Sequence, residues 1–344
     1  MASMDQLQVA EKPVTTLLPT ATTEVKPQKP AFGTLDIFGK VAKVQWQDKA
    51  SLPISRSSCI AVELNGSVYV GSGFEGKSAY DYQFCYRIDV YNLSTNQWSL
   101  SPITTPYRWF AMAVLNGKLI AAGGVTPDDD VTNKVLVLDD EKSWKDYSEM
   151  PTARSCATAV VHQAMLIIIG GKADVEGKVT TIPYTELLDT TDGCWYTCDN
   201  LPVPHYQLKA AVVNSSLYLV GGLTITNQAS PQVFFASLET LSRHQLKWQS
   251  LVDTPWHCQT PVVLANKFLL VVGGRHSTDP TTQSGEVHAL NPSNDSWELI
   301  TNLPEAISGP AAVGVANNQL IVLGGTVGFK QRLYSSNVWI GTFE

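Results

Sequence analysis

The segment Met150–Gly171, MPTARSCATAVVHQAMLIIIGG, contains the pattern that decides the fold. It begins with a proline turn, continues with two apolar stretches of strand length, and ends in two glycines. β-Branched residues are frequent in both stretches, and such residues favour strands. Because glycine tolerates positive φ, the doublet predicts a sharp turn where the second strand ends.

The same pattern recurs along the chain. Apolar runs end in glycine at intervals of 47 to 52 residues, at Gly73, Gly124, Gly171, Gly222, Gly274 and Gly325. A tryptophan series runs in phase with them, at Trp46, Trp98, Trp144, Trp195, Trp248 and Trp297. A proline turn precedes each new apolar stretch, as in LPISR, TPYRW, MPTAR, LPVPH, TPWHC and LPEAIS. Strands repeating about every 50 residues are typical of a propeller, and we interpret these glycines and tryptophans as structural.

These repeats resemble the kelch-repeat family over roughly residues 41–344. The resemblance rests on the glycine doublets, on the tryptophan that follows each of them, and on phrases such as YNLSTNQW (Tyr91–Trp98) and LNPSNDSW (Leu290–Trp297). It implies an all-β fold: a six-bladed kelch-type β-propeller with four antiparallel strands per blade. One departure is Gly71-Ser72-Gly73, which replaces a clean doublet in the first repeat.

The two ends of the repeat region complement each other. The chain closes with SSNVWIGTFE, a third strand with no fourth strand after it, whereas residues 41–53 form an isolated strand that contains Trp46. We therefore predict that the N-terminal strand completes the sixth blade and removes an open sheet edge. Residues 1–30 are rich in Thr, Pro, Lys and Gln and predict a disordered tail, which leaves residues 31–344 as one propeller domain.

Composition narrows the classes of function. With 24 basic and 31 acidic residues the net charge is -7, which argues against a broad nucleic-acid surface. No apolar run reaches the length of a membrane span, the N-terminus lacks signal-peptide features, and six cysteines are too few for a disulfide scaffold. We expect a cytoplasmic protein with free thiols, no membrane contact and no cofactor; the oligomeric state is left open.

The kelch resemblance also implies a ligand-binding face, built from the turn before each first strand and the loop after each glycine doublet. The aromatic and basic residues on these segments are types enriched at interfaces. The predicted face comprises Arg56, Tyr107, Arg108, Trp109, Arg154, Tyr206, Trp256, His257 and Arg275. Its basic residues favour an acidic protein or peptide as ligand. Alternatively, Arg56, Arg108 and Arg154 serve only to hold loops together.

The favoured function is therefore a non-catalytic protein-binding scaffold or adaptor. By resemblance, partners of such proteins include ubiquitin-ligase substrates and actin. The alternative is a small-molecule or metal-dependent enzyme, as in the galactose-oxidase-like propellers that use copper. His205, His257 and His276, with Tyr206 and Asp279, are the residues that such a site would use. No fixed-spacing motif supports them, and Cys194 and Cys198 lack zinc-knuckle spacing, so we predict no catalytic residue and no metal.

Overall fold

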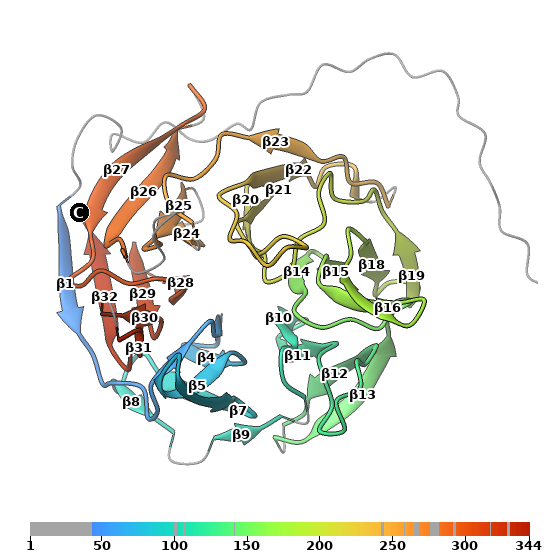
Figure 1. Ribbon diagram of the computed structural model, residues 1–344, viewed down its shortest axis with the longest axis horizontal. Helices are drawn as coiled ribbons and strands as arrows, with labels where there is room; N and C mark the ends of the chain where they lie inside the picture. The colour runs from blue at the N-terminus through green and yellow to red at the C-terminus, as the bar shows by residue number, and fades with distance from the viewer. Residues whose placement is uncertain are drawn as a thin grey trace, which may run out of the picture.

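The computed structural model describes residues 43–344 with short gaps (Figure 1). The residues left out are 1–42, 100–101, 106, 141, 242–243, 258, 265–267, 276–281, 292–293, 317 and 329–330. The predicted tail, His276 and Asp279 lie outside the described residues. The described chain forms β-strands and contains no α-helix, and its sheets stand around a central axis in chain order.

Each repeat contributes one antiparallel sheet of four main strands. The first is β3 (Ile60–Leu64), β4 (Ser67–Gly71), β7 (Arg87–Asn92) and β8 (Gln97–Trp98), with β9 (Ile103–Thr104) also on β7. Next come β10 (Ala111–Leu115), β11 (Lys118–Ala122), β12 (Lys134–Leu138) and β13 (Trp144–Glu149), then β14 (Thr158–His162), β15 (Met165–Ile169), β18 (Thr185–Asp189) and β19 (Cys194–Thr197). The fourth sheet is β20 (Lys209–Val213), β21 (Ser216–Val220), β22 (Val233–Ser237) and β23 (Gln249–Leu251), followed by β24 (Thr260–Leu264), β25 (Phe268–Val272), β26 (Glu286–Asn291) and β27 (Ser296–Asn302).

The remaining sheet combines the two ends of the described chain. It contains β28 (Ala311–Val315), β29 (Gln319–Leu323), β32 (Val338–Phe343) and the N-terminal strand β1 (Val44–Asp48). β1 pairs antiparallel with β32, so that Trp46 lies opposite Gly341. A Cβ on Gly341 would come within 2.7 Å of the Trp46 ring, which shows how closely the indole covers this strand.

The first strands of the repeats surround the centre. β3, β10, β14, β20, β24 and β28 each contact the first strand before and after them, and β28 contacts β3. The glycine doublets connect the sheets through the backbone. Gly124 N donates to Arg154 O at 2.9 Å, and Gly325 N donates to Arg56 O at 2.8 Å, which links the last repeat to the first. At Gly123, with φ +62°, a Cβ would lie 2.3 Å from Arg154 O, so only glycine permits this approach.

The tryptophans of the outer strands form a second set of connections between sheets. Trp98 Nε1 donates to Ala50 O at 2.8 Å, and Trp144 Nε1 donates to Thr104 O at 2.9 Å. The same indole group of Trp195, Trp248 and Trp297 reaches an oxygen of the preceding repeat. Each tryptophan therefore combines apolar contact with a directed hydrogen bond.

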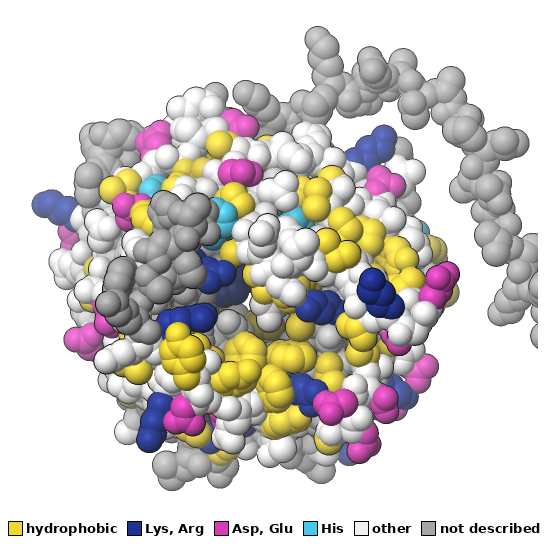
Figure 2. Space-filling view, in the orientation of Figure 1, with side chains coloured by type: hydrophobic (Ala, Val, Ile, Leu, Met, Phe, Trp, Pro, Cys, Tyr) yellow, Lys and Arg dark blue, Asp and Glu magenta, His cyan; other side chains and the backbone are white. Residues whose placement is uncertain are grey.

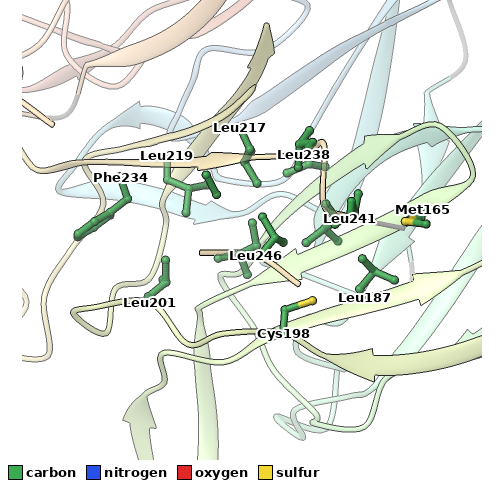
Figure 3. Close-up of a cluster of buried hydrophobic side chains, with 14 of the residues drawn as sticks. Met165, Leu187, Cys198, Leu201, Leu217, Leu219, Phe234, Leu238, Leu241 and Leu246 are labelled. Carbon is green, nitrogen blue, oxygen red and sulfur yellow. The ribbon is translucent and has the colours of Figure 1, made fainter. Parts of the chain in front are cut away.

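The hydrophobic core lies between neighbouring sheets. Figure 3 shows one such cluster, in which Met165 and Leu187 of one sheet face Leu217, Leu219 and Phe234 of the next. These side chains are almost completely buried. Because every sheet packs against two neighbours, the loops at the ends of the strands rest on a continuous packed scaffold.

Candidate ligand-binding face

The turns before the first strands and the loops after the glycine doublets meet on one side of the molecule. Isolated bridges pair Arg108 with Val125, Tyr206 with Leu223 and His257 with Arg275. Because the same bridge type recurs in several repeats, the two sets of loops form one surface, which we call the loop face. Short strands extend it: β2 (Arg56–Ser57), β5 (Phe74–Ser78), β6 (Asp81–Phe84), β16 (Lys172–Val175), β17 (Lys178–Thr181), β30 (Thr326–Val327) and β31 (Leu333–Tyr334).

A cavity of about 270 Å³ opens at the centre of the loop face (Figure 2). Residues in the left-handed region surround its mouth at an equivalent position in five of the repeats: Ser58, Trp109, Cys156, Gln207 and Gly309, with φ between 54° and 58°. Cys156 N donates to Trp109 O at 2.9 Å, and Gln207 N donates to Cys156 O at 2.8 Å. Backbone hydrogen bonds thus connect successive repeats around the mouth of the cavity.

Two of the predicted ligand-binding arginines are buried, which corrects their assignment to the surface. The Arg56 and Arg154 side chains are both fully buried. Arg56 forms an ion pair with Asp89 and donates to Val70 O at 3.0 Å. Arg154 Nη2 lies 2.8 Å from Glu186 Oε2. Each guanidinium is enclosed with a carboxylate of its own repeat, so neither side chain presents a surface to a ligand in this structure.

Arg154 is anchored by further contacts. Its Nη1 donates to Tyr184 O at 2.9 Å and to Gly170 O at 3.2 Å. Burial lowers the pKa of the Arg154 guanidinium, and the Glu186 carboxylate opposes that effect. The contacts join the turn before β14 to the ends of β15 and β18, so Arg154 acts as a loop-holding residue.

Arg108 reaches the loop face but is already engaged. It forms an ion pair with Asp129, from the acidic run at residues 128–130, and its Nη1 donates to Tyr86 Oη at 3.0 Å. Its guanidinium also lies over the Phe84 ring, 4.8 Å from the centroid. A ligand carboxylate would have to compete with Asp129, which is well exposed, for this arginine.

An aromatic cluster lies beside the cavity. Phe84 and Trp109 meet edge to face with centroids 4.8 Å apart, and Phe74 meets Tyr82 at 4.9 Å in the same geometry. Trp109 therefore lies where the sequence predicts an aromatic contact. The sequence already places Phe74 and Tyr82 on this face, because both follow the first glycine doublet, although it does not single them out as ligand contacts; Phe84 was not indicated.

Trp109 and most of the other predicted aromatic residues of the face are half-buried, and Tyr206 is buried. Tyr206 is only 6% exposed; its hydroxyl donates to Asn227 Oδ1 at 2.7 Å, and Lys172 Nζ lies 3.9 Å from its ring centroid. Trp256 is half-buried and its indole donates to Glu286. Tyr107 and His257 are half-buried as well. In this structure Tyr206 offers a partner little contact area.

Large exposed apolar side chains gather on the loops that follow the glycine doublets. They are Tyr80, Tyr82, Val175, Val179, Ile225 and Leu333, with exposed fractions from 37% to 74%. Outside these loops the described chain has four such residues, Tyr147, Val203, Val252 and Leu299. The sequence places Tyr80 and Tyr82 on these loops, but the aliphatic residues Val175, Val179, Ile225 and Leu333 were missed because Arg and aromatic residues were favoured as contacts.

The residues suggested for a metal do not assemble in the described chain. His205 is fully buried beside Phe234, and burial lowers its pKa. Among the described residues, no three His, Cys, Asp or Glu side chains are grouped so that they could hold a metal ion. The described part also contains no helix with the length and hydropathy needed to cross a membrane.

Comparison with known proteins identifies the type of repeat. The KLHDC2/KLHL20/DRC7 kelch-repeats domain matches residues 156–341. A kelch repeat-containing protein of Arabidopsis thaliana is 22% identical over 310 residues, covering 82% of this chain and 71% of the plant protein. Human kelch-like protein 15 is 28% identical over 249 residues, covering 66% of this chain and 40% of that protein.

Two further similarities extend this picture. Kelch-like protein 23 of Pongo abelii is 24% identical over 276 residues, covering 79% of this chain and 46% of that protein. The chain thus spans less than half the length of these two kelch-like proteins. The solved structure of YjhT superimposes with a TM-score of 0.67 at 14% identity, covering 86% of this chain and 99% of YjhT. At that identity the likeness concerns the fold alone.

Proposed function

Because this chain belongs to the kelch-repeat family, we propose that it is a non-catalytic protein-binding module whose loop face holds a protein ligand. One observation carries the proposal. Of the ten large exposed apolar residues in the described chain, six lie on the loops after the glycine doublets. Apolar side chains grouped on one side of a water-exposed protein are typical of interaction sites. Loops held by a rigid scaffold are also common locations for binding residues.

We also propose that the propeller has six blades and is closed by its N-terminal strand. The pairing of β1 with β32 supports closure at the outer edge, and the Gly325–Arg56 hydrogen bond supports it near the centre. On the loop face, β5 of the first repeat pairs with β31 of the last, with Leu333 opposite Ser78. Three independent contacts between the ends of the repeat region would hold the loop face in one shape for a partner.

Because the chain spans less than half the length of the two kelch-like relatives, the roles of those whole proteins do not carry over to it. The adaptor role is therefore a proposal made from the loop face. A scaffold of this kind needs no catalytic group; it needs an exposed surface that loses water favourably when a partner binds. The hairpins β5–β6 and β16–β17 supply such area, since Tyr80 is 74% exposed and Val179 is 60% exposed.

The test begins with purification of partners by affinity capture and mass spectrometry, followed by measurement of the affinity of the purified pair. Tyr80→Ser, Ile225→Ser and Leu333→Ser should each weaken binding, and the best of them by at least about tenfold. Tyr147→Ser on β13 and Leu299→Ser on β27 are matched controls, because these residues are similarly exposed but lie on outer strands. If the controls weaken binding and the loop-face variants leave it unchanged, the partner binds elsewhere.

A further inference from the structure

The central cavity has a charge pattern that the protein as a whole lacks. Lys209, Arg275 and Arg332 line it, and none of its described lining residues is Asp or Glu. The whole chain carries a net charge of -7. Three cations without a carboxylate among them create a local positive potential, which attracts anions into a narrow opening.

Lys209 stands at a position where the other repeats are uncharged. It is the first residue of β20, and the first strands of the other repeats begin with Ile60, Ala111, Thr158, Thr260 and Ala311. Its ammonium donates to Thr260 Oγ1 at 2.9 Å and to Pro310 O at 2.7 Å. Lys209 also lines a second cavity of about 140 Å³. Its charge therefore lies at the junction of the two cavities, and two of the groups that hold it there carry no formal charge.

Arg275 and Arg332 differ from the other arginines of this face. Both are half-buried, and neither guanidinium has an ion pair or a side-chain hydrogen bond with the described residues. Arg56, Arg108 and Arg154, by contrast, each pair with a carboxylate. A guanidinium without a carboxylate at the wall of a cavity can donate two parallel hydrogen bonds to an anionic group.

A buried amide adds a donor to the same wall. Gln259 lines the cavity and is only 2% exposed, and its Oε1 accepts from Trp256 N at 3.2 Å. Its Nε2 has no hydrogen-bond partner in the part of the chain that the structure describes. Buried donors are normally satisfied, so an unpartnered one beside a cavity points to an acceptor that enters from the cavity.

The opposite side of the cavity is aromatic. Phe74, Trp109 and Phe110 line it there and come from the first and second repeats, whereas Lys209 and Arg275 come from the fourth and fifth. The last repeat, which lies between the fifth and the first, supplies both Arg332 and Tyr334. Figure 2 shows hydrophobic side chains along the lower side of the central hollow and Lys or Arg side chains within it and beside it. The cavity thus combines a surface for a flat apolar group with a surface for an anion.

We propose that this cavity binds a small organic anion, with its carboxylate or phosphate toward Lys209, Arg275 and Arg332 and a flat apolar part against Phe74 and Trp109. The volume of about 270 Å³ lies just below the roughly 300 Å³ at which sites for drug-sized ligands begin, so the cavity suits a smaller molecule. This site goes beyond the proposed protein-binding function, because it lies inside the ring of exposed loop residues and does not require a protein partner.

The test uses the full chain and 1-naphthoate, with the neutral isostere 1-naphthamide as control, in isothermal titration calorimetry. The naphthoate should bind saturably, and the amide should bind at least about tenfold more weakly. Binding of the naphthoate should weaken as salt concentration rises. Equal binding of the two compounds, or no saturable binding at millimolar naphthoate, would overturn the proposal.

Variants locate the site. Arg275→Gln and Arg332→Gln should each weaken naphthoate binding by about tenfold, whereas Lys178→Gln, on the exposed β16–β17 hairpin, removes the same charge from the same face and should change nothing. Lys209→Met should have the largest effect; if that variant does not fold, the two arginine variants still decide. Unchanged binding in both arginine variants would place the anion elsewhere.

A peptide arm separates the ligand classes. The blocked tripeptide Gly-Glu-Gly, with Gly-Gln-Gly as control, should bind more weakly than 1-naphthoate, since it has no flat apolar group for the aromatic side. Tighter binding of the acidic peptide would show that the cavity receives a protein side chain instead of a small molecule. Neither outcome depends on the Tyr80 and Ile225 variants, so the proposal of an anion site and the proposal of a protein-binding surface can be refuted independently.

Discussion

Arg154→Met tests whether the buried arginines of this face stabilise the fold or contact ligand. The substitution removes an ion pair in which Arg154 is fully buried and Glu186 is 3% exposed. It leaves the Glu186 carboxylate enclosed without its cation, and it takes a donor from Tyr184 O and from Gly170 O. The Met side chain fills the space of the aliphatic part of Arg154 but not that of its guanidinium head, so a part of the effect comes from the space left there.

The expected loss follows from these contacts. Removing one partner of a buried ion pair costs about 3–5 kcal/mol, against a total stability of about 5–15 kcal/mol for a typical protein. The melting temperature should fall by roughly 6–10 °C. Urea denaturation followed by tryptophan fluorescence gives the free energy of unfolding, and circular dichroism gives the melting temperature.

The matched control is the double variant Arg154→Met/Glu186→Gln. Once both charges are removed, the enclosed site is neutral, so the double variant should recover at least half of the stability lost by Arg154→Met. At a temperature where Arg154→Met is folded, its affinity for a protein partner should match that of the parent. A loss below about 1 kcal/mol, the value for an exposed pair, would refute this reasoning. So would a double variant no more stable than the single one.

Three further predictions concern closure and the thiols. Deleting residues 1–52 removes β1 and should lower the free energy of unfolding by about 3–5 kcal/mol through the loss of Trp46 packing; an unchanged urea midpoint would show that β1 does not stabilise the ring. Gly341→Ala places a Cβ 2.7 Å from the Trp46 ring and should cost about 1–3 kcal/mol in the full chain but little in the truncated chain, a difference that the same urea titrations measure. Cys194 is exposed, whereas Cys85 is buried and its burial raises the pKa of its thiol to about 12. At about pH 8 a thiol reagent should therefore label Cys194 in the native protein and Cys85 only after denaturation. Rapid labelling of Cys85 in the native protein would contradict its burial.

Much of the fold could be predicted because each structural signal occurs several times in the sequence. The kelch resemblance and the all-β architecture are confirmed. A single tryptophan says little about the fold, but a series of tryptophans in phase with the glycine doublets indicates that all of them have the same structural role. In the structure this role is to connect neighbouring sheets: Trp98 Nε1 donates to Ala50 O and Trp144 Nε1 donates to Thr104 O, each in the preceding repeat.

The site was harder to predict because residue type does not reveal a partner that is distant in sequence. Arg56 and Arg154 match the composition of interfaces, yet each is paired with a carboxylate on the third strand of its own sheet, Asp89 on β7 and Glu186 on β18. Asp89 lies opposite Val70 and Glu186 opposite Ile168, equivalent places in the two repeats. In the other repeats the position equivalent to Arg56 and Arg154 holds Tyr107, His205, Trp256 or Ile307. A comparison of the six repeats, asking which of them carry both the arginine and the carboxylate, could therefore have revealed the two ion pairs.

Positions at which one repeat differs from the others indicate which residues serve a purpose other than packing. A ring of equivalent first-strand residues needs only small or apolar side chains to pack, and Ala111, Thr158 and Ala311 meet that need. Lys209 breaks the pattern, since removing an ammonium partly from water costs free energy that a small or apolar side chain would not cost. Packing alone therefore gives no reason for a cation at this position, whereas an anion held against Lys209, Arg275 and Arg332 would. The buried amide nitrogen of Gln259, which has no acceptor among the described residues, would gain one from that anion.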